Sequence, residues 1–217
     1  MGANESTVAG NPHERPDLRL VLLVVGGFTV GLASSRSVGV WWAAFAASLS
    51  AFGLFALLPA VRMPFEREPT DSRLVLRGVI AGVFMVAICW AGRSLFWLLP
   101  PFFLDELVAL YDLIRQSPGP AKGLPILLVT ACVEEFVFRG LVLSAMLSRY
   151  RPLIAVIAAS VVSVLPQLAF SSPMLIMVVF ACGLVFGTMR VLSGSLLMPL
   201  GAHVVFSVSL FVLIPLV

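Results

Sequence analysis

Residues 124–148 read LPILLVTACVEEFVFRGLVLSAMLS, an apolar run with two adjacent acids and an arginine near its centre. A helix needs about 20 apolar residues to cross the hydrocarbon core of a bilayer, so the run predicts a membrane-spanning helix. Insertion scales put an acid at the centre of such a helix near +2.5 to +3.5 kcal/mol. Glu134, Glu135 and Arg139 therefore need partners, a function, or both.

The rest of the chain has the composition of a membrane protein. Of its 217 residues, 60% are hydrophobic and 12% are charged, whereas soluble domains are about one-quarter charged. This composition excludes a soluble globular domain and a disordered chain. We expect an all-α, polytopic transmembrane helix bundle with about seven spans, because strands of an outer-membrane barrel would alternate in polarity. The expected spans are residues 18–34, 38–61, 76–99, 124–148, 152–170, 173–191 and 195–217.

The charges that flank these spans predict a cytoplasmic N-terminus through the positive-inside rule. The inner flanks then hold Arg15, Arg19, Arg62, Arg67, Arg73, Arg77, Arg149, Arg151 and Arg190. The outer flanks hold only Arg36, Arg115 and Lys122. A net charge of +3 placed in this way indicates membrane orientation and no nucleic-acid partner. We expect residues 1–17 to form a disordered cytoplasmic tail and residues 18–217 a single bundle, in the plasma (inner) membrane of a bacterium.

Two further features concern the packing of the bundle. The connection at residues 100–123 is either an amphipathic helix lying on the membrane interface or an ordinary loop. Its regularly spaced apolar side chains are Phe103, Leu107, Leu110 and Ile114. GxxxG pairs permit close helix packing, inside the bundle or between chains, and they occur at Gly27 with Gly31 and at Gly183 with Gly187.

Away from the ends of the predicted spans, few ionisable side chains occur: Arg93, Glu134, Glu135, Arg139 and His203. Glu135 and Arg139 are four residues apart on one helical face and can pair. Glu134 lies about 100° around the helix from Glu135 and has no local cation, so it is protonated or faces a wet cavity. Arg93 either extends its head group to the outer interface or lines a substrate entrance. Polar groups of this kind can also serve as hydrogen bonds between helices.

A carboxylate beside an imidazole can activate water as a general base while a second group stabilises the oxyanion. Other hydrolytic chemistries lack their motifs. There is no HExxH zinc motif, the serine signature GxSG is absent, and Tyr111-Asp112 is not followed by GxGD. Cys132 could act as a thiol nucleophile, although a small apolar Cys in a helix usually only packs. We therefore favour glutamate chemistry without a metal or another cofactor.

The stretch Glu134–Gly140 resembles the EExxxR motif of the CAAX-protease and bacteriocin-processing (CPBP, Abi) family of intramembrane glutamic endopeptidases. The C-terminal stretch is similar to the later motifs of that family: Gly183, Gly187, Arg190, Ser193, Gly194, Ser195, Pro199 and His203. The resemblance covers about residues 124–210, which would form the catalytic core.

The resemblance implies a metal-independent hydrolase that cleaves a membrane-associated protein or peptide. Glu134 would polarise a water molecule, and Glu135 would support Glu134. Arg139 would hold the carboxylate of Glu135, and His203 would donate a hydrogen bond to the oxyanion. The lipid bilayer and a protein or peptide substrate are the partners implied.

Two positions depart from the family pattern. Gln167 stands where the family has a histidine that shares the water, and Ser207 stands where it has an asparagine. Both remain candidates for water or oxyanion contacts, but an amide cannot take a proton near neutral pH. Activity could therefore be reduced or lost, which leaves a non-catalytic binding or immunity protein as the alternative. A proton-coupled transporter is less favoured, because the sequence has no repeated halves.

Restoring the histidine with Gln167→His separates these cases. A large gain in peptide hydrolysis by the variant, measured on isolated membranes, indicates an enzyme slowed by the loss of a base, since general acid–base groups contribute about 10²–10⁴-fold. An unchanged rate indicates a binding role or a rearranged site.

Overall fold

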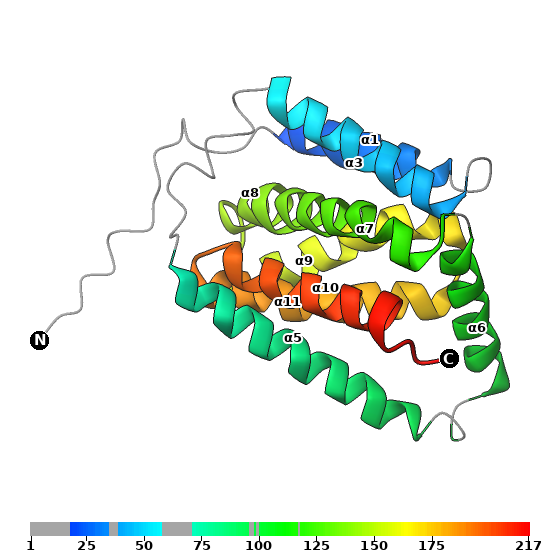
Figure 1. The fold of residues 1–217 in the computed structure, drawn as a ribbon. Helices are drawn as coiled ribbons and strands as arrows, with labels where there is room; N and C mark the ends of the chain where they lie inside the picture. Colours follow the sequence, from blue (N-terminus) through cyan, green and yellow to red (C-terminus); the bar gives the residue numbers. More distant parts are fainter. Residues whose placement is uncertain (1–17, 35–38, 58–70, 96–97, 99, 117) are drawn as a thin grey trace, which may run out of the picture.

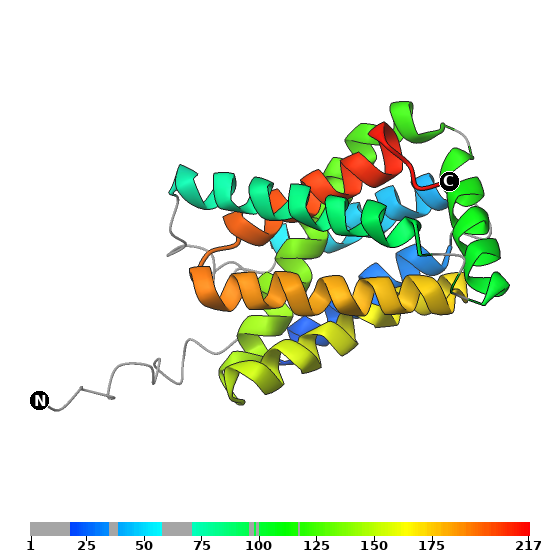
Figure 2. The ribbon, with the colours of Figure 1, turned by 90° about the horizontal axis from the view of Figure 1, so that it is seen from below.

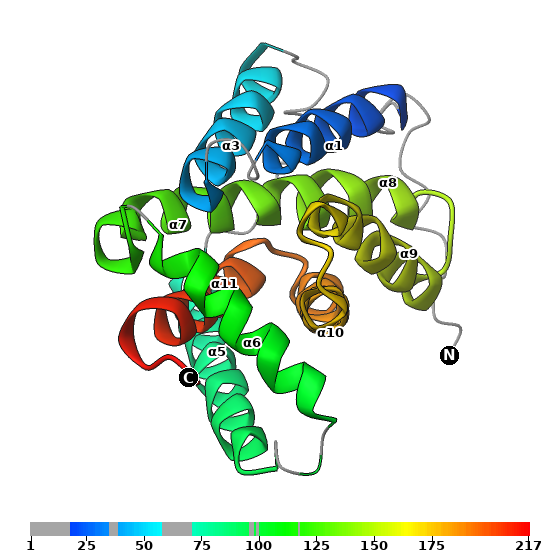
Figure 3. The same cartoon turned by 90° about the vertical axis from the view of Figure 1, so that its right-hand side faces the viewer.

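The computed structural model describes residues 18–34, 39–57, 71–95, 98, 100–116 and 118–217, and these residues form an all-helical bundle (Figure 1). The expected tail at residues 1–17 lies outside the described part of the chain. Helices α1 (Leu18–Ala33) and α3 (Val40–Leu57) pack as a pair on one side of the central segment. On its other side lie α5, α9, α10 and α11 (Figure 3).

The central segment is continuous and consists of α7 (Pro120–Glu134), the π-helix η4 (Glu135–Val142) and the short α8 (Leu143–Leu147). The sequence predicts one regular helix at residues 124–148. The observed segment begins four residues earlier, because Gly119 turns the chain with φ 80° and Pro120 occupies the first helical turn. A proline is tolerated there since its missing N–H would have no partner anyway.

The other helices follow the predicted order with shifted ends. Asp71 caps α5 (Ser72–Arg93) by accepting a hydrogen bond from the backbone N–H of Arg73, so α5 starts before the expected residue 76 and ends well before residue 99. After the central segment come α9 (Pro152–Val164) with the 3₁₀-helix η5 (Leu165–Phe170), α10 (Pro173–Ser193), and α11 (Leu197–Val208) with the π-helix η6 (Ser209–Leu213). Hydropathy alone misplaced the ends of α5 because it does not register polar caps.

Among the described residues, three helical segments are long and apolar enough to cross a membrane: Ser72–Arg93, Pro152–Phe170 and Pro173–Ser193. Shorter apolar helices cover Val21–Ala33, Val40–Ala51 and Leu197–Leu213. The class predicted from composition, an all-helical protein with membrane-spanning segments, agrees with these helices. Seven spans and a cytoplasmic N-terminus stay predictions.

The connection before the central segment contains helix α6 (Pro101–Arg115), which confirms a helix rather than a loop. It runs across one end of the bundle (Figure 2). Its buried face holds Leu107, Tyr111 and Ile114. The Tyr111 hydroxyl donates to the carbonyl of Leu210 at 2.9 Å and accepts from the N–H of Leu216 at 3.1 Å. Burial raises the pKa of Tyr111, so the hydroxyl keeps the proton that it donates.

Helix α11 crosses α5 at glycines that the sequence analysis did not single out. An added Cβ at Gly78 would collide with the carbonyl oxygen of Met198, and one at Gly82 would lie 2.7 Å from that of Ala202. The predicted close packing at Gly183 is confirmed, because an added Cβ would lie 2.9 Å from the Ser160 side chain on α9. Glycine thus lets α5 approach the backbone of α11.

We expect Gly82→Ala to lower the free energy of unfolding by about 1–3 kcal/mol, because the new methyl group overpacks the crossing of α5 and α11. Gly92→Ala, on the same helix, is the matched control: its Cβ meets nothing within 4 Å. Denaturant titration in mixed micelles measures both. Equal stability of the two variants would contradict the tight crossing.

Candidate active site

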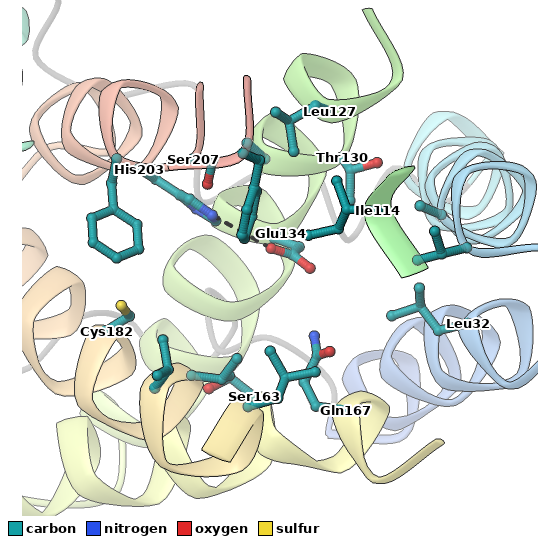
Figure 4. A pocket seen from close by; sticks show the side chains of 18 of the residues that line it. Leu32, Ile114, Leu127, Thr130, Glu134, Ser163, Gln167, Cys182, His203 and Ser207 are labelled. Carbon is teal, nitrogen blue, oxygen red and sulfur yellow. Dashed lines mark ion pairs between the residues drawn. The ribbon is translucent and has the colours of Figure 1, made fainter. Parts of the chain in front are cut away.

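Polar side chains from several helical segments converge on one pocket in the middle of the bundle (Figure 4). Glu134 ends α7, and η4 begins with Glu135 at the next residue. His203 comes from α11, and Gln167 comes from η5. The structure thus brings together residues that lie far apart in the sequence, from position 134 to position 203.

The two acids stand where the central segment changes from an α-helix to a π-helix. The N–H of Leu143 bonds to the carbonyl of Phe138, five residues earlier, as a π-helix requires. Single π turns inside α-helices occur frequently at functional sites. The hydrophobic pattern gave no indication of this change, because a π turn keeps the segment continuous.

Glu135 is 1% exposed, and a single oxygen of its carboxylate meets two partners. Its Oε1 lies 3.1 Å from Nη1 of Arg139, so the predicted i,i+4 pair is present. The same Oε1 lies 2.7 Å from Nδ1 of His203. Glu135 therefore links the central segment to α11.

Glu134 has no such cation on its own helix. Its Oε2 lies 3.6 Å from Nε2 of His203, and the two side chains face each other in the pocket (Figure 4). One imidazole thus stands between two consecutive carboxylates, each facing a different ring nitrogen. The direct contacts of Glu135 are with His203 and Arg139, while its expected support of Glu134 stays a prediction.

Phe186 on α10 holds the imidazole from its face, a contact that the sequence analysis missed. The two rings are stacked, with centroids 5.1 Å apart and an interplanar angle of 24°. The guanidinium of Arg139 lies 5.2 Å from the centroid of the same phenyl ring. Phe186 is 1% exposed and therefore fixes the plane of His203 and the position of Arg139 together.

The pocket has a volume of about 210 Å³. Its polar lining includes Glu134, Gln167, His203 and Ser207, and the amide of Gln167 lies across the pocket from the α11 side (Figure 4). Most of the remaining lining is apolar, with Trp41 from α3 among it. The site can therefore hold a polar reacting group among apolar walls.

Two residues weighed in the sequence analysis lie elsewhere. Cys132 is not among the pocket-lining residues, whereas Cys182, which the sequence analysis did not consider, is. Arg93 donates from Nε to the carbonyl of Leu216 at 2.6 Å and lies over the ring of Trp90, so it contacts neither the pocket nor its acids. Within the described ranges, no group of three or more His, Cys, Asp or Glu side chains is arranged to hold a metal ion.

Fold and site together define an all-helical protein with a carboxylate–imidazole site inside an apolar bundle. Residues 117–209 match a family model described as "Rce1-like: Type II CAAX prenyl endopeptidase Rce1-like". This match confirms the resemblance to the CAAX-protease family, and its segment carries Glu134, Glu135, Arg139, Gln167 and His203. No match was found among curated proteins or among solved structures.

We expect Arg139→Met to lower the free energy of unfolding by about 3–5 kcal/mol, because it leaves the buried carboxylate of Glu135 without its cation. The double variant Arg139→Met with Glu135→Leu should recover much of this loss. Arg149→Met, at an exposed position in the turn that follows α8, is the control. SDS titration of the purified protein measures all of them. A loss no larger than that of the control would contradict the role of Arg139.

Proposed function

We propose that this protein is a metal-independent intramembrane glutamic endopeptidase that hydrolyses a peptide bond of a membrane-associated protein or peptide. The observation that carries the proposal is the placement of Glu134 and His203 on one side of an apolar-walled pocket, with Glu134 Oε2 3.6 Å from His203 Nε2. The matched family supports the same class of reaction.

In the proposed reaction, a water molecule lies between Glu134 and the scissile carbonyl. The Glu134 carboxylate accepts a hydrogen bond from this water and polarises it. His203 stabilises the oxygen of the carbonyl as it becomes tetrahedral. The apolar walls limit competing solvent, which strengthens these electrostatic contacts.

Gln167 and Ser207 complete the polar lining in this proposal. The amide of Gln167 can donate to the substrate or the water and accept from either. Ser207, one turn after His203 on the same helix, offers a hydroxyl to the pocket. Neither group is a base near neutral pH, so both are assigned to orientation.

A second function, a binding or immunity protein of the same family fold, is favoured by one specific observation. The pocket holds Gln167 where the family pattern has a titratable histidine. In that case Glu134 and His203 would recognise a polar group of a bound peptide without cleaving it.

The test is Glu134→Gln in the full-length protein, expressed in membranes from which the native copy is deleted. We expect uncleaved substrate to accumulate, with a rate lowered by about 10²–10⁴-fold, because the amide cannot polarise the water as a carboxylate does. Quantitative proteomics of new peptide termini measures the change.

The matched control is Asp112→Asn, the same chemical change at an exposed ion pair with Arg115 on α6. It should leave the termini unchanged. If Glu134→Gln leaves every terminus unchanged at equal expression, the proposed peptidase is rejected in favour of the binding protein.

A further inference from the structure

Both ring nitrogens of His203 face a carboxylate, but the two contacts are unequal. Nδ1 lies 2.7 Å from Oε1 of Glu135, which is a short hydrogen bond. Nε2 lies 3.6 Å from Oε2 of Glu134, which is beyond a direct hydrogen bond. The imidazole is therefore held at Nδ1 and presents Nε2 to the pocket.

The partners of Glu135 decide which atom donates in the short contact. Its Oε1 is paired with the guanidinium of Arg139, and an ionised carboxylate has only acceptors. The hydrogen between Glu135 and His203 must therefore belong to Nδ1. A neutral imidazole carries one N–H, so Nε2 then has a free lone pair directed at the pocket.

We propose that Glu135 is a positioning residue that fixes the Nδ1–H tautomer of His203, and that Nε2 of His203 takes the proton of the attacking water. The proton-transfer part rests on the proposed endopeptidase function. It gives His203 the role of base that the family pattern assigns to the position of Gln167. Glu134 keeps its role, because it accepts the hydrogen bond of the second proton of the same water.

The step balances as follows. The water oxygen forms a bond to the carbonyl carbon, one water proton moves to Nε2, and the π electrons of the carbonyl move to its oxygen. The imidazolium can now donate a hydrogen bond to the oxyanion. When the C–N bond breaks, the nitrogen of the leaving amine takes the proton from Nε2 and the carbonyl forms again. His203 returns to its neutral form.

The surroundings of His203 suit a group that gains and loses a positive charge. The charged or titratable groups that share its site are Glu134 from α7, Glu135 and Arg139 from η4, and Cys182 from α10. Oε2 of Glu135 is buried and, among the described residues, has no hydrogen-bond partner. Within the described part of the chain, the charge of Glu135 is thus shared between Arg139 and His203, so it can stabilise an imidazolium.

Stacking on Phe186 restrains the plane of the imidazole. A 180° flip of the ring within that plane would place a carbon atom where Nδ1 now stands, so the 2.7 Å contact with Glu135 is what selects the observed orientation. Gln167 lies across the pocket and can orient a water but cannot take its proton.

The tautomer is measured directly by ¹⁵N NMR of histidine-labelled, full-length protein in lipid nanodiscs. The chain has only two histidines, so His13→Gln leaves His203 as the single source of signal. At neutral and mildly alkaline pH we expect a protonated Nδ1 and an unprotonated Nε2. Glu135→Gln should shift the population toward Nε2–H, since an amide can also donate, and Glu135→Asp should retain the Nδ1–H form. A neutral Nε2–H form in the otherwise unchanged protein overturns the proposal, whether or not the variants fold.

The proton transfer is tested on a substrate found with the Glu134→Gln experiment. Glu135→Gln should lower kcat by about 10²–10⁴-fold with little change in KM, and the acid limb of the pH–rate profile should move, with partial rescue by Glu135→Asp. Gln167→His should give little gain.

Cleavage that needs Glu134 but has the same kcat and pH profile in Glu135→Gln overturns this inference and leaves the proposed function standing. Absence of any Glu134-dependent cleavage overturns the function and the proton transfer, while the NMR experiment still decides the tautomer.

Discussion

The organisation of the site depends on one buried negative charge. Glu135 is 1% exposed inside an apolar bundle, where an unpaired carboxylate would cost several kcal/mol. Arg139 supplies the local cation, and His203 supplies a second donor from a helix 68 residues later. Because both donors meet the same oxygen, the charge ties η4 to α11. A substitution at Glu135 therefore also changes the surroundings of the imidazole.

The approach of α11 to the central segment requires close packing behind it. Gly78 and Gly82 let the backbone of α5 lie against Met198 and Ala202, and Ala202 precedes His203. On the side of α10, Phe186 packs flat on the imidazole. The glycines and the phenyl ring neither give nor take a proton in the proposed mechanism, yet they help to determine where Nε2 points. They contribute to the site by positioning the imidazole of His203.

The sequence was sufficient for features that depend on local spacing and composition. The Glu135–Arg139 pair follows from a separation of four residues. The spacing of Leu107 and Ile114 was compatible with α6 but left an ordinary loop open. The contact of Glu135 with His203 could not be predicted in this way, because it joins segments whose relative rotation is set by packing. The π turn was also missed, since it changes the hydrogen-bond step without interrupting the apolar run.

The replacement of a histidine by Gln167 agrees with the charge balance of the site. Glu134 and Glu135 contribute two negative charges when ionised, and Arg139 contributes one positive charge. Such a site has no net charge when His203 is an imidazolium, which is the state reached after the water is activated in the proposed mechanism. A second protonated imidazole, at position 167, would add a positive charge. No further carboxylate among the described pocket residues could balance it. Since charge in an apolar cavity is stable only when compensated, one imidazole between two acids suits the proposed proton transfer, and a neutral amide suits the opposite wall.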